Sequence, residues 1–296
     1  MSDKEVDTFS GVETTGHEWD GITELNNPLP RWWLWTWYAT IAFSLGYVIY
    51  YPAIPLISSY TQGISGETTR SVVEKDLAAA EQAKSGMVQK ILDTPLEEIR
   101  TDDALFRFAT AGGQSLYKVY CTQCHGSGAQ GAPGFPNLND DDWLWGGDLE
   151  TIYTTIAHGV RNDEDDDARF SDMMAFGEDD MLSGTEIVAV SEFVRKISGQ
   201  EHNADNATTG IEIFADNCAA CHGDDGLGGR DLGAPNLGDA LWLYGGSLNE
   251  IATQIRTPKH GVMPAWLGRL GEASVKQLTV YIHSLGGGEK ELASAE

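Results

Sequence analysis

The chain has few cysteines and few basic residues, and each scarcity excludes a class of protein. Its 296 residues include four cysteines, all in C-x-x-C pairs, so none is left for a disulfide framework. It has 19 Lys and Arg against 45 Asp and Glu, a formal net charge of -26. Such a charge repels nucleic acid phosphates, which disfavours a nucleic acid partner and favours a cationic one.

Charged residues are also missing from a long N-terminal stretch, Trp32 to Gly66. Within it, residues 32–51 are mostly aromatic and aliphatic, and as a helix they would cover about 30 Å, the thickness of a bilayer's hydrocarbon core. Pro52 and Pro55 would end that helix. The leader, residues 1–31, has seven acids and two bases, unlike the short basic leader of a signal peptide. We therefore predict a retained transmembrane anchor over residues 32–57.

Beyond a polar linker, residues 58–107, the sequence repeats itself. The linker contains an alanine-rich stretch, Asp76 to Gln82, that is typical of an exposed helix or a semi-rigid spacer, and we expect no chemistry there. The two copies, residues 108–199 and 205–288, precede a tail, residues 289–296. Both copies have a glycine and an aromatic residue before a C-x-x-C-H motif, and P-N-L, W-L-x-G-G and H-G-V segments after it. The corresponding residues are Gly113 and Gly210 for the glycine, Tyr117 and Phe214 for the aromatic residue, and Pro136 and Pro235, Trp143 and Trp242, and His158 and His260 at the start of the three segments.

Each copy closes with apolar residues at three- and four-residue spacing, residues 185–197 and 274–285. We therefore predict an all-α chain of one N-terminal transmembrane helix and two tandem domains.

The motif C-x-x-C-H occurs once in each copy, and its spacing carries the chemistry. Two thiols on one helical turn can add to the vinyl groups of a haem while the following imidazole reaches the iron. The motifs are Cys121, Cys124 and His125, and Cys218, Cys221 and His222. A zinc half-site and a thioredoxin-like pair are the alternatives, but each pair has its own histidine and lies in a separate repeat. We predict two covalently bound haem c groups.

A sixth iron ligand is expected after each motif. Met263 is the one methionine after Cys221, and aligning the two copies selects Met173 in the first. Met174 and Met181 are the competing residues there, with filling of the core as their ordinary role. His158 and His260 are also repeated and are alternative ligands. The sequence leaves open whether each methionine serves the haem of its own copy or of the other.

A histidine and a methionine together saturate a haem iron, which favours electron transfer over catalysis. The carbonyl groups of Pro136 and Pro235 are placed to accept the other ring N–H of His125 and His222. The repeated Trp143 and Trp242 either pack on the haem edge or are ordinary core aromatics.

An acidic insertion, Arg161 to Arg169, lengthens the first copy with five consecutive acids. Such a run is typical of a solvated loop, with a docking edge for a basic protein and a calcium site as alternatives. Residues 108–199 hold 16 acids and 5 bases, and residues 205–288 hold 9 and 5. We expect a basic donor protein to dock mainly on the first copy.

Together with the repeat, the leader segments H-E-W-D-G-I from His17 and N-N-P-L-P-R-W-W-L-W from Asn26 resemble the dihaem subunit III of cbb3-type cytochrome c oxidases. The resemblance covers nearly the whole chain. It implies two class I cytochrome c domains with His125, Met173, His222 and Met263 as axial ligands. It also implies a bacterial inner-membrane location, with the N-terminus cytoplasmic and the haem domains periplasmic.

The implied partners are the other oxidase subunits, a basic donor cytochrome c and the lipid bilayer, with oxygen reduced on another subunit. A dihaem shuttle, a dehydrogenase's cytochrome subunit and a dihaem peroxidase share some of these features.

Overall fold

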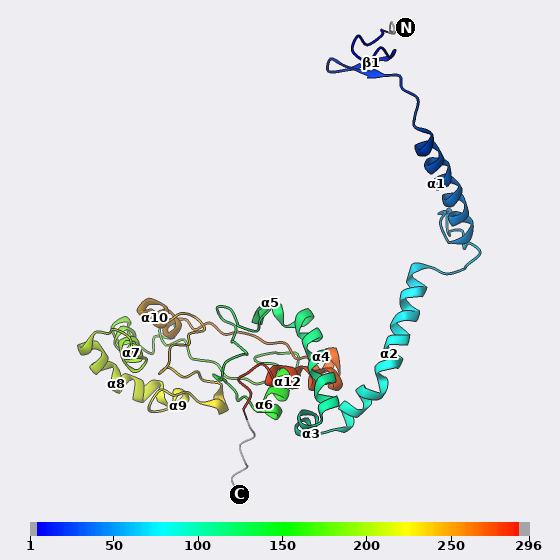
Figure 1. Cartoon of the computed structure of the whole chain (residues 1–296). Helices are drawn as coiled ribbons and strands as arrows, with labels where there is room; N and C mark the ends of the chain where they lie inside the picture. Colours follow the sequence, from blue (N-terminus) through cyan, green and yellow to red (C-terminus); the bar gives the residue numbers. More distant parts are fainter. Residues whose placement is uncertain (1–4, 290–296) are drawn as a thin grey trace. The chain divides into compact units, whose positions relative to one another are not determined.

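The computed structural model describes residues 5–289 and divides the chain into two compact units, residues 1–83 and residues 84–296 (Figure 1). Of the predicted tail, residues 289–296, only Glu289 lies among the described residues. The haem motifs all belong to the second unit, which is helical apart from isolated β-bridges.

The first unit contains a β-hairpin, so the all-α prediction is wrong for the leader. Strands β1 (Thr14–Trp19) and β2 (Ile22–Leu25) pair antiparallel, with Trp19 opposite Ile22. Asp20 and Gly21 between them both have positive φ, +51° and +84°. That is the backbone of a type I′ turn, in which Asp-Gly is a favoured pair. The Asp20-Gly21 pair is therefore the local sequence signal for this hairpin.

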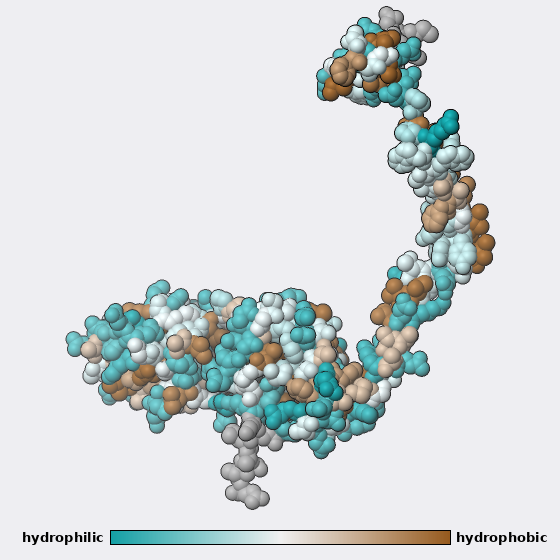
Figure 2. Space-filling view, in the orientation of Figure 1, coloured by the Kyte–Doolittle hydropathy of each residue, from teal (hydrophilic) through white to brown (hydrophobic). Residues whose placement is uncertain are grey.

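Helix α1 (Arg31–Tyr50) lies where the predicted anchor begins. None of its residues is buried, and Trp35 and Phe43 are 74% and 71% exposed. Among the described residues, however, no helix has both the length and the apolar character needed to cross a bilayer. The transmembrane prediction is therefore not confirmed. Tryptophan, tyrosine and hydroxyl side chains lower the mean hydropathy of α1, and Figure 2 colours much of it pale.

The second half of the predicted linker is part of a core rather than a spacer. Helix α2 (Thr69–Asp93) includes the expected alanine-rich stretch, and α3 (Leu96–Thr101) follows it. Ile91 and Ile99 are fully buried against Leu149 and Val280. The ammonium group of Lys276 lies 2.8 Å from the carbonyl oxygen of Leu92, at the end of α2, where a positive charge is favourable.

The first C-x-x-C-H motif lies among helices taken from both repeats. Helix α4 (Asp103–Tyr120) and one-turn helix α5 (Thr122–His125) precede α6 (Leu149–His158). These pack against α11 (Leu267–Leu270) and α12 (Glu272–His283), the last helices of the second repeat. The shared core contains Tyr117, Ile152, Val275 and Leu278. We call α3 to α6 with α11 and α12 the Cys121 module.

The second C-x-x-C-H motif also lies among helices from both repeats. Helix α7 (Gly184–Ile197), the last of the first repeat, packs against α8 (Ala204–Asn217) and α10 (Leu248–Arg256). One-turn helix α9 (Ala219–His222) and the 3₁₀ turn η1 (Arg230–Leu232) lie between α8 and α10 in the chain. Val190, Phe214 and Ile251 share this core. We call α7 to α10 the Cys218 module.

Neither repeat, 108–199 or 205–288, therefore encloses a core of its own. Burying one aliphatic side chain stabilises the folded state by about 1.5–3 kcal/mol. The buried residues of α7 therefore stabilise the Cys218 module, and those of α12 stabilise the Cys121 module. The two predicted domains, residues 108–199 and 205–288, therefore describe the repeat in the sequence and do not coincide with the two modules.

Glycines at equivalent positions allow both helix pairs to approach closely. A Cβ atom on Gly113 in α4 would overlap the backbone carbonyl of Gln277 in α12, and one on Gly210 in α8 would overlap that of Ala189 in α7. These glycines are the ones that the repeat alignment places eight residues before the first cysteine. Their role is the contact between the first helix of one repeat and the last helix of the other.

We predict that Gly113→Ala destabilises the haem-loaded protein by about 1–3 kcal/mol, since the new methyl group forces α12 away from α4. The matched control is Gly86→Ala in α2, where a Cβ meets nothing within 4 Å. That change should be neutral or stabilise by about 0.5–1 kcal/mol. Denaturant unfolding measures both variants, and equal stability of the two would contradict the packing described here.

Candidate functional site

Each C-x-x-C-H motif forms one helical turn at the end of a longer helix. Cys121 ends α4, and the N–H of His125 donates to its carbonyl oxygen at 3.0 Å. Cys218 ends α8, and the N–H of His222 donates to its carbonyl at the same distance. The two cysteines of a motif and its histidine are therefore held on one short turn, as the spacing predicts.

The two histidine rings are oriented in the same way. Nδ1 of His125 lies 3.0 Å from the carbonyl oxygen of Pro136, and Nδ1 of His222 lies 3.0 Å from that of Pro235. A carbonyl oxygen only accepts, so Nδ1 carries the proton and Nε2 keeps its lone pair for a metal. Burial lowers the pKa of both histidines, which the proline carbonyls partly oppose. Both rings therefore remain neutral and able to ligate iron.

The cysteines lack the properties of a reactive dithiol. Burial, with a smaller effect of the neighbouring thiol, raises the pKa of Cys121 and of Cys218 to about 11. A thioredoxin-like pair needs a lowered thiol pKa, because the thiolate is the nucleophile. The raised pKa of Cys121 and Cys218 therefore disfavours the redox-pair alternative.

The zinc alternative is disfavoured by the distribution of possible ligands. Within residues 5–289, three or more His, Cys, Asp or Glu side chains lie close enough to share a metal ion in one place, at His158, Asp165 and Asp167. This group contains no cysteine. The first cysteine of each pair, Cys121 or Cys218, instead packs against an apolar core.

The structure places the two candidate methionines across the repeats. Met263 packs against the core that contains Cys121, together with Trp143 and Trp266. Met173 packs against the core that contains Cys218, together with Trp242. Each methionine therefore lies with the motif of the other repeat. Trp143 and Trp242 lie at the edges of these same cores.

The backbone fixes Met263 against α6. Its N–H donates to the carbonyl oxygen of Val160 at 2.9 Å, and its carbonyl accepts from the N–H of Val160 at 3.0 Å. Gly159, with φ of +79°, lies so close that a Cβ atom there would overlap the Met263 carbonyl. The N–H of Trp266 also bonds the last carbonyls of α6. Met263 is thus held in the Cys121 module through main-chain contacts.

The competing residues lie elsewhere. Met174 and Met181 are 51% and 44% exposed, so neither fills a core. Nδ1 of His158 bonds the carboxylate of Asp165, and Nδ1 of His260 lies 3.0 Å from that of Asp172. Both histidines thus have carboxylate partners, and neither belongs to a core that contains a motif.

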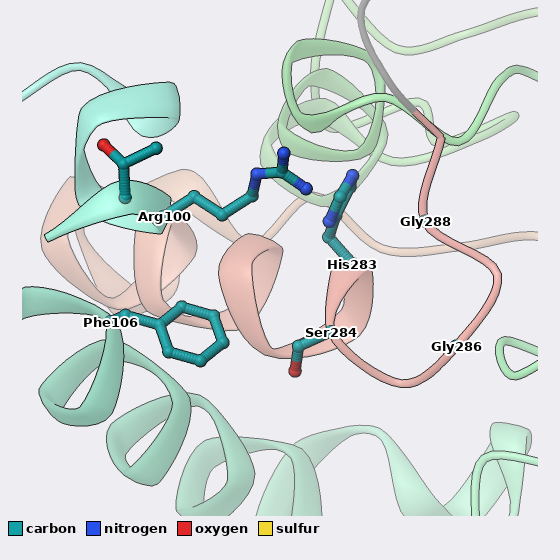
Figure 3. A pocket seen from close by; sticks show the side chains of 7 residues that line it. Arg100, Phe106, His283, Ser284, Gly286 and Gly288 are labelled. Atoms are coloured by element: carbon teal, nitrogen blue, oxygen red, sulfur yellow. The ribbon is translucent and has the colours of Figure 1, made fainter. Parts of the chain in front are cut away.

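A pocket in the same unit contains none of the predicted ligands. Arg100, Phe106 and His283 line it between α3, α4 and the end of α12 (Figure 3). The ring of His283 bonds the carbonyl of Glu289 there, which joins Glu289 to the end of α12.

Comparison with known proteins agrees with this geometry. The family described as cytochrome c oxidase, cbb3-type, subunit III matches residues 108–194 and 205–282, and the N-terminal domain of cytochrome oxidase-cbb3, FixP, matches residues 11–58. The chain belongs to this subunit III family. Its predicted resemblance is thereby confirmed.

Relatives match over almost their full length. The chain is 53% identical to the cbb3-type cytochrome c oxidase subunit FixPc of Rhizobium leguminosarum bv. viciae, over 97% of this chain and 100% of the relative. It is 52% identical to CcoP of Cereibacter sphaeroides, over 93% and 95%. It is also 52% identical to FixP of Sinorhizobium medicae, over 97% and 98%.

Membership implies binding of c-type haem, and the residues present fit that group. Each motif supplies two thiols and a neutral imidazole with a free Nε2, and each faces a core that carries a methionine thioether. These are the donors that a covalently attached, six-coordinate haem requires.

Tyr117 supports the first motif from beneath, a contact that the sequence did not reveal. It is 1% exposed, and its hydroxyl donates to the carbonyl of Gly126 at 2.7 Å. Burial raises the pKa of Tyr117 to about 12, so the hydroxyl remains a donor. The second motif has Phe214 at this position and lacks the bond.

We predict that Tyr117→Phe lowers the free energy of unfolding by about 1–2 kcal/mol, because the Gly126 carbonyl loses its buried donor. Tyr281→Phe is the control, since that hydroxyl makes no hydrogen bond within residues 5–289. Thermal unfolding of the haem-loaded protein compares the two variants. A Tyr117→Phe protein as stable as the Tyr281→Phe protein would contradict the assigned bond.

Proposed function

We propose that the chain is a dihaem electron-transfer subunit of a cbb3-type oxidase. It passes electrons from a donor cytochrome c to the monohaem and catalytic subunits in aerobic or microaerobic respiration. The supporting observation is the matched pair of sites, in which two C-x-x-C-H turns have the same histidine-to-proline bond and each faces a methionine. Haem, when bound there, supplies a one-electron couple.

The ligand assignment follows the packing rather than the order of the sequence. We infer that His125 and Met263 hold the iron at Cys121 and Cys124, and that His222 and Met173 hold the iron at Cys218 and Cys221. Each methionine packs in the core of the motif assigned to it. Two strong-field ligands leave no open position for oxygen or peroxide. The chain is therefore not itself an oxidase or a peroxidase, and oxygen is reduced on another subunit.

A variant with a single haem tests the assignment. Cys218→Ala with Cys221→Ala should halve the haem stain on a denaturing gel and leave the haem at Cys121 and Cys124. In that background, Met263→Ala should lower the remaining potential and admit carbon monoxide, because the thioether is lost. Met173→Ala should do neither, and Met181→Ala, an exposed methionine, serves as the control.

Carbon monoxide binding after Met173→Ala, but not after Met263→Ala, would assign each methionine to its own repeat. Extraction of haem from the unmutated chain by acid-acetone would contradict covalent attachment. Carbon monoxide binding by the reduced wild-type chain would favour a peroxidase.

A basic cytochrome c is the proposed electron donor. In the acidic insertion, Asp163, Asp166 and Asp167 are exposed, whereas Asp165 is half-buried beside His158. The segment from Phe176 to Val194 supplies apolar side chains to the core of the Cys218 module, so the acids within it, Glu178 to Glu192, lie with that module although they belong to the first repeat. The insertion is the longest acidic run beside the Cys121 module, where Asp148 and Glu150 at the start of α6 add to it.

We predict that replacing Asp163, Asp166 and Asp167 with Asn slows donor oxidation by about three- to tenfold at low ionic strength and flattens its salt dependence. Stopped-flow kinetics across ionic strengths measures this. Replacing the exposed Glu178, Asp179 and Asp180 with Gln and Asn is the control of equal charge. Equal slowing by both triples would remove the insertion from the docking site, and a rate that rises with salt would exclude a basic donor.

The location is part of the proposal. The charge-free segment, residues 32–66, exposes the aromatic side chains of α1, and we propose that lipid and helices of the other subunits cover them at the bacterial inner membrane. The N-terminus is then cytoplasmic and the haem modules are periplasmic, where haem is attached to such motifs.

The full chain should stay in the membrane fraction after an alkaline carbonate wash, and a variant lacking residues 1–66 should be released. Protease added to the periplasmic side should cleave the haem modules in intact cells stripped of their outer membrane. Complete release of the full chain by carbonate would exclude this anchoring.

A further inference from the structure

Arg161 contacts both of the loops that carry the methionines. Its Nε donates to the carbonyl of Gly261 at 2.7 Å, and its Nη1 donates to the carbonyl of Ser171 at 2.8 Å. Gly261 stands two residues before Met263, and Ser171 stands two residues before Met173. One guanidinium group therefore bridges the two segments that bring thioethers to different modules.

The position of Arg161 is fixed by an unusual backbone. Its φ is +50°, a left-handed conformation that costs a non-glycine residue about 1 kcal/mol or more unless the surroundings enforce it. Its N–H bonds the carbonyl of Arg169 at 2.7 Å, and Val160 before it forms the two hydrogen bonds with Met263. The side chain, 23% exposed, is thus directed between the loops by main-chain contacts on both sides.

Two further side chains complete the network. The carboxylate of Asp172, next to Met173, lies 4.0 Å from Nε of Arg161 and 3.0 Å from Nδ1 of His260. His260 stands three residues before Met263. A second connection between the two methionine loops therefore runs through the side chains of Arg161, Asp172 and His260.

We propose that Arg161 is a positioning residue shared by both haem sites, which fixes how both methionines approach their irons. This rests on the proposed function, in which Met173 and Met263 are the sixth ligands. The planar guanidinium fork can donate to two carbonyl groups in fixed directions, whereas a lysine ammonium is a point charge on a flexible stem. Charge alone therefore does not reproduce the bridge.

Arg161→Ala removes one side-chain restraint from each loop, while the cysteines and histidines keep the haems attached. Its expected effect is weaker methionine-to-iron absorption, a lower potential and carbon monoxide binding at both haems. Arg161→Lys retains the charge but not both bonds, so it should restore these properties only in part. Arg107→Ala removes one exposed positive charge elsewhere in the unit and should change none of them.

The experiment uses the full chain in its purified oxidase complex and reads spectra and potentials rather than turnover. Arg161→Ala is measured in the wild-type background and in each single-haem background, beside Met173→Ala and Met263→Ala. Changes at both haems with Arg161→Ala, and at one haem with each methionine variant, support the proposal.

Wild-type spectra and potentials in Arg161→Ala, or a change at one haem alone, overturn the shared role while the methionine variants still report ligation. Full rescue by Arg161→Lys overturns the bridge and leaves a charge effect. Unchanged haems in the methionine variants would instead overturn the ligand assignment itself.

Discussion

The close contact of α12 with α4 is the constraint on which the rest of the second unit depends. Gly113 allows the two helix backbones to approach, and Val275 and Leu278 then complete the core beneath the first motif. The same contact brings Lys276 to the end of α2 and places Met263 beside Val160. Without it, the first motif would have neither a closed core nor a thioether beside it.

The exchange of helices and methionines between the two repeats makes the two sites interdependent. The Cys121 module takes α12 and Met263 from the second repeat, so it closes only when most of the unit has folded, whereas the Cys218 module takes α7 and Met173 from the segment just before it. Such long-range pairings require large loops to close, which slows folding compared with two independent domains. The benefit is a shared boundary, where Arg161, Asp172 and His260 join segments that serve different haems.

The electrostatics of the sites and of the surface have different origins. Burial sets the properties of the motifs, because desolvation lowers the pKa of His125 and raises that of Cys121. The surface is governed by the excess of acidic side chains, which act through long-range fields and are screened by salt. The packing of α7 with α8 redistributes these acids, since Glu178 to Glu192 lie in the segment whose apolar residues join the Cys218 module.

The sequence by itself determined what is local. The C-x-x-C-H turn, the proline carbonyl behind each histidine and the choice of Met173 over Met174 all follow from spacing and repeat alignment. The structure forms both turns and both histidine-to-proline contacts, and Met173 as a ligand stays a prediction. Family membership is likewise legible in the motifs. The Asp20-Gly21 turn is a local signal of the same kind, whereas aromatic and hydroxyl side chains make α1 less apolar than its lack of charge suggests.

Only the tertiary structure decided which methionine lies with which motif. The two repeats are alike, so α7 and α12 present similar apolar faces, and Gly113 and Gly210 could each accept either helix. Local patterns cannot distinguish such equivalent partners. The six-residue connection from Ser198 to Asn203 favours a hairpin of α7 with α8, which leaves α12 to cover α4. That pairing is a property of the whole unit, because its free energy comes from surfaces about 160 residues apart in the chain.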